Sequence, residues 1–307
     1  MLIGPTAVGK SSTAIAVAER LIAEQVDCEL VNLDSMLVYR GMDIGTAKPT
    51  RAERERVRHH LVDIVDIEWE ASVAEFQTWA REAIADCRGR GVVPLLVGGS
   101  ALYTRAVVDE FSFPGTDPVV REGYERRLVE IGAPALHEEL RRRDPEAAEQ
   151  IIASNGRRIV RALEVITLTG KPYRASLPSN RHALTGVIEL GLDADRAWLD
   201  DRIAQRVDQM WADGLVDEVR GLAERGLART RTASRALGYR QVLEHLGGAY
   251  DQDEARARTI SGTRRFARKQ YGWYRRDDRI RWLEARDPDL VATIVAAVRQ
   301  QLVGMGD

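Results

Sequence analysis

The segment Gly4–Ser12, GPTAVGKSS, constrains the fold of this 307-residue chain more than any other. It matches G-x-x-x-x-G-K-[ST], a pattern in which a glycine-rich loop joins a strand to a helix and surrounds phosphate oxygens with main-chain N–H groups. Lys10 brings a positive charge to the same oxygens, and Ser11 offers a hydroxyl to Mg²⁺. The motif predicts a polyphosphate site without specifying ATP, and a chance match in a plain strand–turn–helix is the alternative.

Short apolar runs alternate with amphipathic segments along much of the chain. The segment Val73–Gly91 has helical periodicity and stops at glycines. The runs that predict strands are Leu2–Ile3, Cys28–Ser35, Val92–Ser100 and Gly186–Asp195, with a further edge strand at Ile280–Ala285. Only Met1 to Ile3 precede Gly4, so either the first strand is very short or the true start lies upstream. Strands that alternate with helices indicate a parallel α/β sheet.

The middle of the chain has a different pattern. From about Pro114 to Arg174 the sequence is helical and charged, with no good strand. We therefore predict an α/β fold, with a P-loop parallel-sheet core, a helical insertion domain and a helix-rich C-terminal part. The expected divisions are 1–113 for the first part of the core, 114–185 for the insertion, and 186–307 for the return to the sheet and the C-terminal helices.

Composition limits the classes of function. The formal net charge is −2, so binding to nucleic acid would require a local basic patch. Cys28 and Cys87 lie in apolar contexts without a C-x-x-C motif, which indicates reduced thiols in a cytoplasmic protein. The chain has no apolar run of about 18 residues and no secretory signal, so we expect no contact with a membrane.

Polar residues follow two of the predicted strands. Asp34 stands at the end of a buried strand, where α/β folds bind ligands. It is a candidate general base, a candidate Mg²⁺ ligand or, like Ser35, a simple helix cap. Ser100 follows two glycines that permit close approach of a ligand, and its hydroxyl either caps the next helix or touches a substrate.

Basic residues are concentrated in the second half of the chain. The segment Arg256–Arg276 has eight Lys or Arg and no acid, with Phe266, Trp273 and Tyr274 among them. Charge runs are usually solvated faces, but guanidinium groups interleaved with aromatic rings also suit RNA phosphates and unstacked bases. Arg157 and Arg161 are four residues apart and share one face of a predicted helix.

Six blocks of the sequence together resemble the tRNA dimethylallyltransferase family, also called the tRNA isopentenyltransferases, in its bacterial form. In order they are GPTAVGKS, DSMLVYRGMDIGTAKP, HHLVDI, PLLVGGSALY, RALEV and ALGYRQ, and they extend over nearly the whole chain. DIGTAKP and GYRQ are far more specific than the P-loop. With two cysteines, both before residue 88, the chain lacks the C-terminal zinc finger of eukaryotic relatives.

The resemblance implies transfer of a dimethylallyl group from dimethylallyl diphosphate to the exocyclic amine of the adenosine 3′ of the anticodon in tRNA, with release of diphosphate. The P-loop would then hold the donor diphosphate with Mg²⁺, and the protein would act as a monomer. Asp34 would accept the amine proton or orient the amine, and Lys10 would stabilise the leaving diphosphate. Ser100 is the third catalytic residue that the resemblance implies; it stands where many members have threonine, and its hydroxyl keeps the chemistry possible.

The resemblance also implies sets of binding residues. For the diphosphate they are Gly4, Thr6, Ala7, Val8, Gly9, Lys10, Ser11, Ser12 and Arg206, with Ser11 as the Mg²⁺ ligand. For tRNA they are Asp34, Ser35, Met36, Leu37, Ser100, Arg121, Arg157, Arg158, Arg161, Arg235, Gly238, Tyr239 and Arg240.

Three alternative functions share parts of this pattern. An adenylate isopentenyltransferase acting on AMP, ADP or ATP would use the same loop but would not need the helical insertion or the GYRQ block. A P-loop small-molecule kinase would not need the long basic C-terminal half. A non-catalytic RNA-binding module is disfavoured by the intact Lys10, Ser11 and Asp34.

Overall fold

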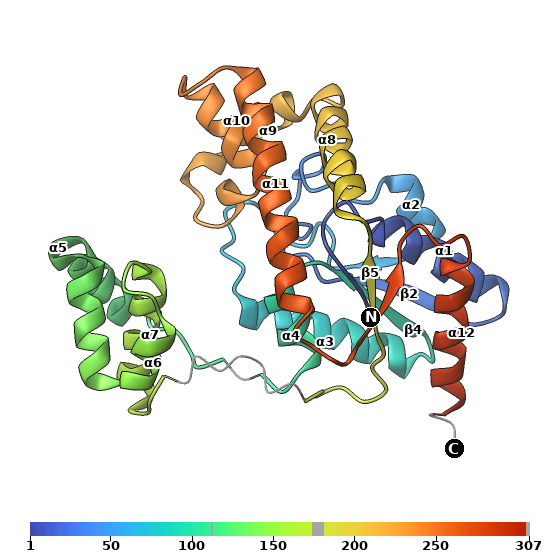
Figure 1. Cartoon of the computed structure of the whole chain (residues 1–307), viewed down its shortest axis with the longest axis horizontal. Coiled ribbons are helices and arrows are strands. Elements are labelled where there is room, and N and C mark those ends of the chain that lie inside the picture. Colours follow the sequence, from blue (N-terminus) through green and yellow to red (C-terminus); the bar gives the residue numbers. More distant parts are fainter. Residues whose placement is uncertain (112, 174–180, 305–307) are drawn as a thin grey trace. The chain divides into compact units, whose positions relative to one another are not determined.

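The computed structural model describes residues 1–111, 113–173 and 181–304 of the chain (Figure 1). Two compact units are formed, one from Met1–Asp109 with His182–Asp307 and the other from Glu110–Arg181. Residues 174–180 of the expected insertion and residues 305–307 of the expected C-terminal part lie outside the described residues. In the part of the chain that is described, no helix is long and apolar enough to cross a membrane.

The core unit contains a six-stranded sheet whose strands all pair in parallel, which confirms the predicted fold class. The order is β3-β2-β4-β1-β5-β6. The strands are β1 (Leu2–Ile3), β2 (Cys28–Asn32), β3 (His59–His60), β4 (Val93–Gly98), β5 (Glu189–Asp193) and β6 (Ile280–Glu284). The strand β3 was not predicted, because two histidines make no apolar run.

Helices cover both faces of the sheet because successive residues of a buried strand point to opposite sides. Leu2 packs on one side with α1 (Lys10–Ala23) and α12 (Leu290–Val303), whereas Ile3 packs on the other with α3 (Val73–Gly89) and α4 (Ala101–Val108). Figure 1 shows α12 beside α1 and α4 beside α3. In α/β folds of this kind, ligands bind at the carboxyl ends of the strands.

The remaining elements of the core unit are mostly helices. They are α2 (Arg51–Arg56), α8 (Arg196–Ala212), α9 (Leu215–Glu224), α10 (Tyr239–Leu246) and α11 (Gln252–Tyr274), with short 3₁₀ turns at Leu227–Arg229 and Ala233–Arg235. Most of the basic segment 256–276 is therefore one helix, α11, which packs against α8 and α10.

The second unit is helical, as the sequence predicts. It contains α5 (Pro118–Arg143), α6 (Pro145–Gln150) and α7 (Gly156–Thr169). Helix α5 is kinked where Gly132 takes a left-handed φ of 78°, shortly before Pro134. Leu136, Leu140 and Leu163 are completely buried between the helices, so the unit has a hydrophobic core of its own.

Candidate active site at the phosphate loop

The phosphate loop joins β1 to α1 and needs glycine at both ends. A Cβ on Gly4 would lie 2.8 Å from the carbonyl oxygen of Leu192, and Gly9 caps α1 with a left-handed φ of 104°. Ala7 is also left-handed, at φ 66°. Where left-handed and right-handed backbone conformations follow one another, successive N–H groups turn to one side. They form a nest for an anion at the positive end of α1. Ala7 and Val8 are buried, and their main chain forms the loop.

Three cations gather at this loop: Lys10, Arg206 and Arg202, whose Nε donates to the carbonyl oxygen of Ala7 at 3.1 Å. The Lys10 ammonium donates to the carbonyl oxygen of Pro5 at 2.7 Å. Burial, with a smaller contribution from the nearby Arg206 guanidinium, lowers the pKa of Lys10 to about 7, although Asp34 opposes the shift. Arg206, on α8, donates to the hydroxyl of Thr6 at 3.4 Å. The fold thus brings Arg206 to the P-loop, as the predicted diphosphate contact requires.

The two serines of the motif have different environments. Ser12 donates its hydroxyl to the carbonyl oxygen of Gly9 at 2.9 Å, so that this hydroxyl is engaged within the loop. Ser11 is exposed at the first turn of α1. Its hydroxyl and the Asp34 carboxylate are hard oxygen donors of the kind that bind Mg²⁺ together with substrate phosphates.

Asp34 lies in a turn directly after β2 and does not cap a helix. Its Oδ1 accepts from the Met36 N–H at 3.0 Å, so one carboxylate oxygen shapes the local turn. The buried Asn32 side chain bonds both the N–H and the carbonyl oxygen of Asp34, each at 2.8 Å. Asn32 therefore holds the residue in place, a role that sequence reasoning missed. Ser35 is buried, whereas Met36 and Leu37 are half-buried.

Ser100 precedes α4 as its N-cap residue, but its side chain makes no capping hydrogen bond. The simple capping role that the sequence left open is therefore wrong. A Cβ on Gly99 would lie 3.3 Å from the Lys10 ammonium and 2.5 Å from the Gln270 amide. The end of β4 and the P-loop thus meet closely enough for one ligand to touch both.

Gln270, on α11, joins these two segments. Its Oε1 accepts from the Thr6 N–H at 2.8 Å, and its amide donates to the Gly99 carbonyl at 2.7 Å. The residue is buried, with 6% of its surface exposed. Gln270 lies in the basic segment 256–276, whose charges and aromatic rings did not predict this role.

We expect Gln270→Leu to lower the free energy of unfolding by about 1–3 kcal/mol, because it removes the partner of the half-buried Thr6 N–H and of the buried Gly99 carbonyl. The P-loop should also bind inorganic diphosphate more weakly. Urea unfolding and calorimetry measure the two effects. Gln300→Leu, at an exposed position on α12, is the control. Unchanged stability and affinity in the Gln270 variant would contradict the bridging role.

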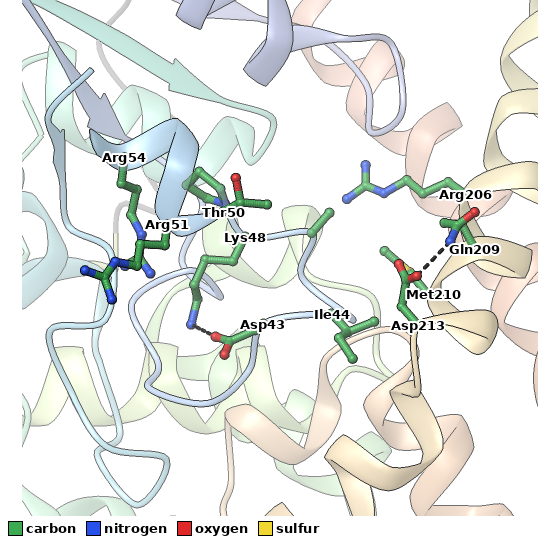
Figure 2. Close-up of a pocket in the computed structure, with 12 residues that line it drawn as sticks. Asp43, Ile44, Lys48, Thr50, Arg51, Arg54, Arg206, Gln209, Met210 and Asp213 are labelled. Carbon is green, nitrogen blue, oxygen red and sulfur yellow. Dashed lines mark hydrogen bonds and ion pairs between the residues drawn. The ribbon is translucent and has the colours of Figure 1, made fainter. Parts of the chain in front are cut away.

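A cavity of about 480 Å³ lies beside the loop (Figure 2). One wall comes from the DIGTAKP loop and α2, and the other from α8. Its lining residues are Asp43, Ile44, Ala47, Lys48, Pro49, Thr50, Arg51, Arg54, Arg206, Gln209, Met210 and Asp213. Arg206 belongs both to this lining and to the P-loop contact, so the cavity adjoins the anion site.

The predicted tRNA contacts of the core unit fall into two groups. Arg235 and Arg240 are exposed. Tyr239 is completely buried and donates its hydroxyl to Glu218 at 2.6 Å, and Gly238 is buried beside it. The predicted direct contact of Tyr239 with tRNA is inconsistent with this position, because its ring packs inside the protein.

The predicted contacts of the helical unit also differ among themselves. Arg157 and Arg158 are exposed at the start of α7. Arg161 is half-buried and donates to the carbonyl oxygens of Pro114 and Gly115 and to Glu164. It therefore holds the segment before α5, and 23% of its side chain is exposed. Arg121 is half-buried and paired with Glu125.

Some side chains of the basic segment 256–276 are engaged within the protein and others are exposed. Arg264 donates to the carbonyl oxygen of Asp200, while Tyr271 and Arg275 bond Asp193. The exposed side carries Arg265, Phe266, Arg268, Lys269, Trp273 and Arg276. Cations and aromatic rings still share this surface.

Among the described residues, two side-chain clusters have the composition of metal sites, but each is paired with an arginine. The first is Glu29, His60 and Cys87, and the second is Asp109, His182 and Glu189. Arg90 donates to both oxygens of Glu29, and Arg105 donates to both oxygens of Glu189. The guanidinium groups thus already neutralise these carboxylates. Cys28 and Cys87 are both buried thiols, as expected.

A parallel sheet with a phosphate loop opening its first helix defines a P-loop α/β protein. The family model described as IPP transferase matches residues 37–277, and the chain belongs to this family. A tRNA dimethylallyltransferase of Cutibacterium acnes is 58% identical over 297 residues, which cover 97% of this chain and 93% of the relative. One from Salinispora arenicola is 56% identical, with 97% and 85% covered.

Solved structures agree. A full-length tRNA isopentenylpyrophosphate transferase from Bacillus halodurans is 37% identical and superposes with a TM-score of 0.71, covering 99% of this chain and 96% of the other. A eukaryotic dimethylallyltransferase, solved as it acts on tRNA, is 25% identical with a TM-score of 0.79, covering 99% and 78%. The family resemblance found in the six sequence blocks is confirmed.

Proposed function

We propose that this protein transfers a dimethylallyl group from dimethylallyl diphosphate to tRNA and releases diphosphate. The acceptor is the exocyclic amine of the adenosine 3′ of the anticodon. The observation that supports this most directly is the convergence of Lys10, Arg206 and Asp34 at the phosphate loop. The protein acts in the cytoplasm as a monomer.

The reaction is a displacement at the first carbon of the prenyl group. A carbon–nitrogen bond forms to the adenine amine, the carbon–oxygen bond to diphosphate breaks, and the departing diphosphate takes the electron pair. Lys10, Arg206 and the loop N–H groups stabilise the charge that develops on the leaving group. Asp34 orients the amine or takes the proton that it loses.

Ser11 would hold Mg²⁺ through its exposed hydroxyl. The ion would supply positive charge next to the leaving group. Val8, Gly9 and the rest of the loop bind the diphosphate through their main chain.

The target base leaves its stack to enter the core unit, since an amine inside a structured loop cannot reach Asp34. Asp34, Ser35, Met36, Leu37 and Ser100 stand at the carboxyl ends of β2 and β4, where such a base would arrive. The exposed guanidinium groups of Arg235 and Arg240, and the exposed side of α11, bind RNA phosphates. Arg157, Arg158 and Arg121 contact the anticodon arm from the helical unit.

Neutralising Arg157 and Arg158 together, as Arg157→Gln with Arg158→Gln, should weaken tRNA binding and flatten its salt dependence. Each phosphate contact that is lost should reduce the slope of log K against log salt concentration by about one. Filter binding between low and physiological salt measures the slope. Arg20 and Arg299, which are exposed and both pair with Glu24, provide a matched double control. An unaltered slope would mean that Arg157 and Arg158 meet no phosphate.

Acceptor preference separates the proposed function from its alternatives. The protein is incubated with labelled dimethylallyl diphosphate, Mg²⁺ and either unmodified tRNA or AMP, and in a third reaction with labelled ATP alone. We expect label in tRNA only. Label in AMP would indicate an adenylate isopentenyltransferase, and ATP hydrolysis without prenyl transfer would indicate a kinase-like protein.

A further inference from the structure

The main chain of the DIGTAKP loop is fixed by one carboxylate. Glu218, on α9, accepts from the N–H groups of Asp43 at 3.1 Å and Ile44 at 2.8 Å through Oε2. Its Oε1 accepts from the Gly45 N–H at 3.4 Å and from the Tyr239 hydroxyl at 2.6 Å. A single side chain therefore collects three consecutive main-chain donors, and Tyr239 fixes its orientation.

Close packing around the Glu218 carboxylate restricts the DIGTAKP loop to one conformation. A Cβ on Gly45 would lie 2.4 Å from the Tyr239 ring and 3.0 Å from Leu215, so no side chain fits there. Further along the loop, Lys48 is buried and donates to the carbonyl oxygen of Tyr39 at 2.7 Å and to Asp63 at 2.6 Å. The loop is thus held at both ends, by Glu218 and by Lys48.

This loop forms a wall of the 480 Å³ cavity (Figure 2). Ile44 and Ala47 lie on the loop side, and Met210 lies on α8. Arg206 reaches the cavity from α8 as well and bonds the P-loop at Thr6. The cavity therefore offers apolar surface next to the anion site, which suits a short hydrocarbon chain attached to a diphosphate. Glu218 itself does not line it.

We propose that Glu218, seated by Tyr239, is a positioning residue for the prenyl donor. Its bonds join the loop wall to α9, which follows α8 along the chain, and so fix one side of the cavity that receives the carbon chain beyond the diphosphate. This inference rests on the proposed function for the identity of the donor. It also gives the buried Tyr239 of the GYRQ block a role that does not require contact with tRNA.

The test compares Glu218→Ala, Glu218→Gln and Tyr239→Phe with Asp217→Asn. Asp217 is the neighbouring residue on α9, is 80% exposed and pairs only with Arg220 among the described residues. Asp217→Asn therefore controls for the loss of one negative charge from α9 without any change at the loop. We expect Glu218→Ala to raise the KM for dimethylallyl diphosphate by about tenfold or more, because the loop that forms the cavity wall loses three main-chain hydrogen bonds to a charged group. The KM for tRNA and the kcat at saturating donor should change by less than about threefold, since the chemistry and the RNA surface are untouched.

The milder variants keep the test decisive if Glu218→Ala folds poorly. Glu218→Gln retains one oxygen for the Asp43 and Ile44 N–H groups, so it should recover most of the donor affinity. Tyr239→Phe removes one bond and should have an intermediate effect. Amide hydrogen exchange should become faster at 43–45 in proportion to the rise in donor KM across the series.

Two results would overturn the proposal. One is a Glu218→Ala variant with the same donor KM as Asp217→Asn. The other is a parallel loss of donor affinity, tRNA affinity and melting temperature, which would indicate a general structural role. Direct calorimetry with dimethylallyl diphosphate separates this inference from the proposed function. Wild-type protein that binds the donor without modifying tRNA would contradict the proposed function, while the Glu218 series would still test the inference.

Discussion

Replacing Asp34 by asparagine should lower the turnover of prenyl transfer by about 10²–10⁴, the usual contribution of a general base, while tRNA affinity stays nearly unchanged. The asparagine keeps the Oδ1 that accepts from the Met36 N–H, so the turn after β2 is preserved. It cannot take a proton. Single-turnover rates with saturating tRNA and donor measure the chemical step directly, and filter binding measures the affinity.

Asp34→Ala separates the two roles that remain open for this residue. If Asp34 takes the proton, both variants lose the same activity. If it only orients the amine, asparagine restores most of what alanine loses. Asp66, exposed and paired with Arg40, provides the control as Asp66→Asn. Full turnover in both Asp34 variants would remove this residue from the chemistry.

Lys10 should make donor binding depend on pH. In the free protein its pKa is about 7, because burial and Arg206 disfavour the charged form. A bound diphosphate favours that form and raises the pKa. Below pH 7 Lys10 is already protonated, whereas above pH 7 binding must take up a proton. Diphosphate affinity should therefore fall by up to about tenfold for each pH unit above 7, until the pKa of the complex is reached.

Calorimetry with inorganic diphosphate at pH 8, in buffers of different ionisation enthalpy, counts the protons taken up. Lys10→Met should abolish the uptake that is due to this residue and weaken binding by about 10- to 100-fold, because it removes a charge-assisted contact. The difference between wild type and variant cancels the protonation of diphosphate itself. Equal uptake by both proteins would show that Lys10 stays charged in the free protein.

The local parts of the site were predictable from the sequence. The P-loop, Asp34 and Ser100 each follow a predicted strand, and parallel strands bring their carboxyl ends to one edge. The nine residues of the glycine-rich loop are enough to predict it, since its conformation depends on residues that are adjacent in the chain.

The supporting contacts were not predictable in this way. Gln270 bonds Thr6 across 264 residues, and Glu218 bonds the loop at Ile44 across 174. No local periodicity or motif in the sequence indicates either contact. The sequence did not predict the surroundings of Tyr239 and Arg161 either. Both stand in segments whose composition suits an RNA surface, but Tyr239 is buried and Arg161 bonds the main chain before α5.

The most direct measurement is the product balance of a reaction that contains dimethylallyl diphosphate, unmodified tRNA and Mg²⁺ but no ATP. Free diphosphate is quantified together with prenylated adenosine from digested tRNA, and a reaction without protein serves as the blank. We predict equal amounts of the two products, with the prenyl group on the adenosine 3′ of the anticodon. Diphosphate released without prenylated adenosine, or neither product from folded protein, would contradict the account.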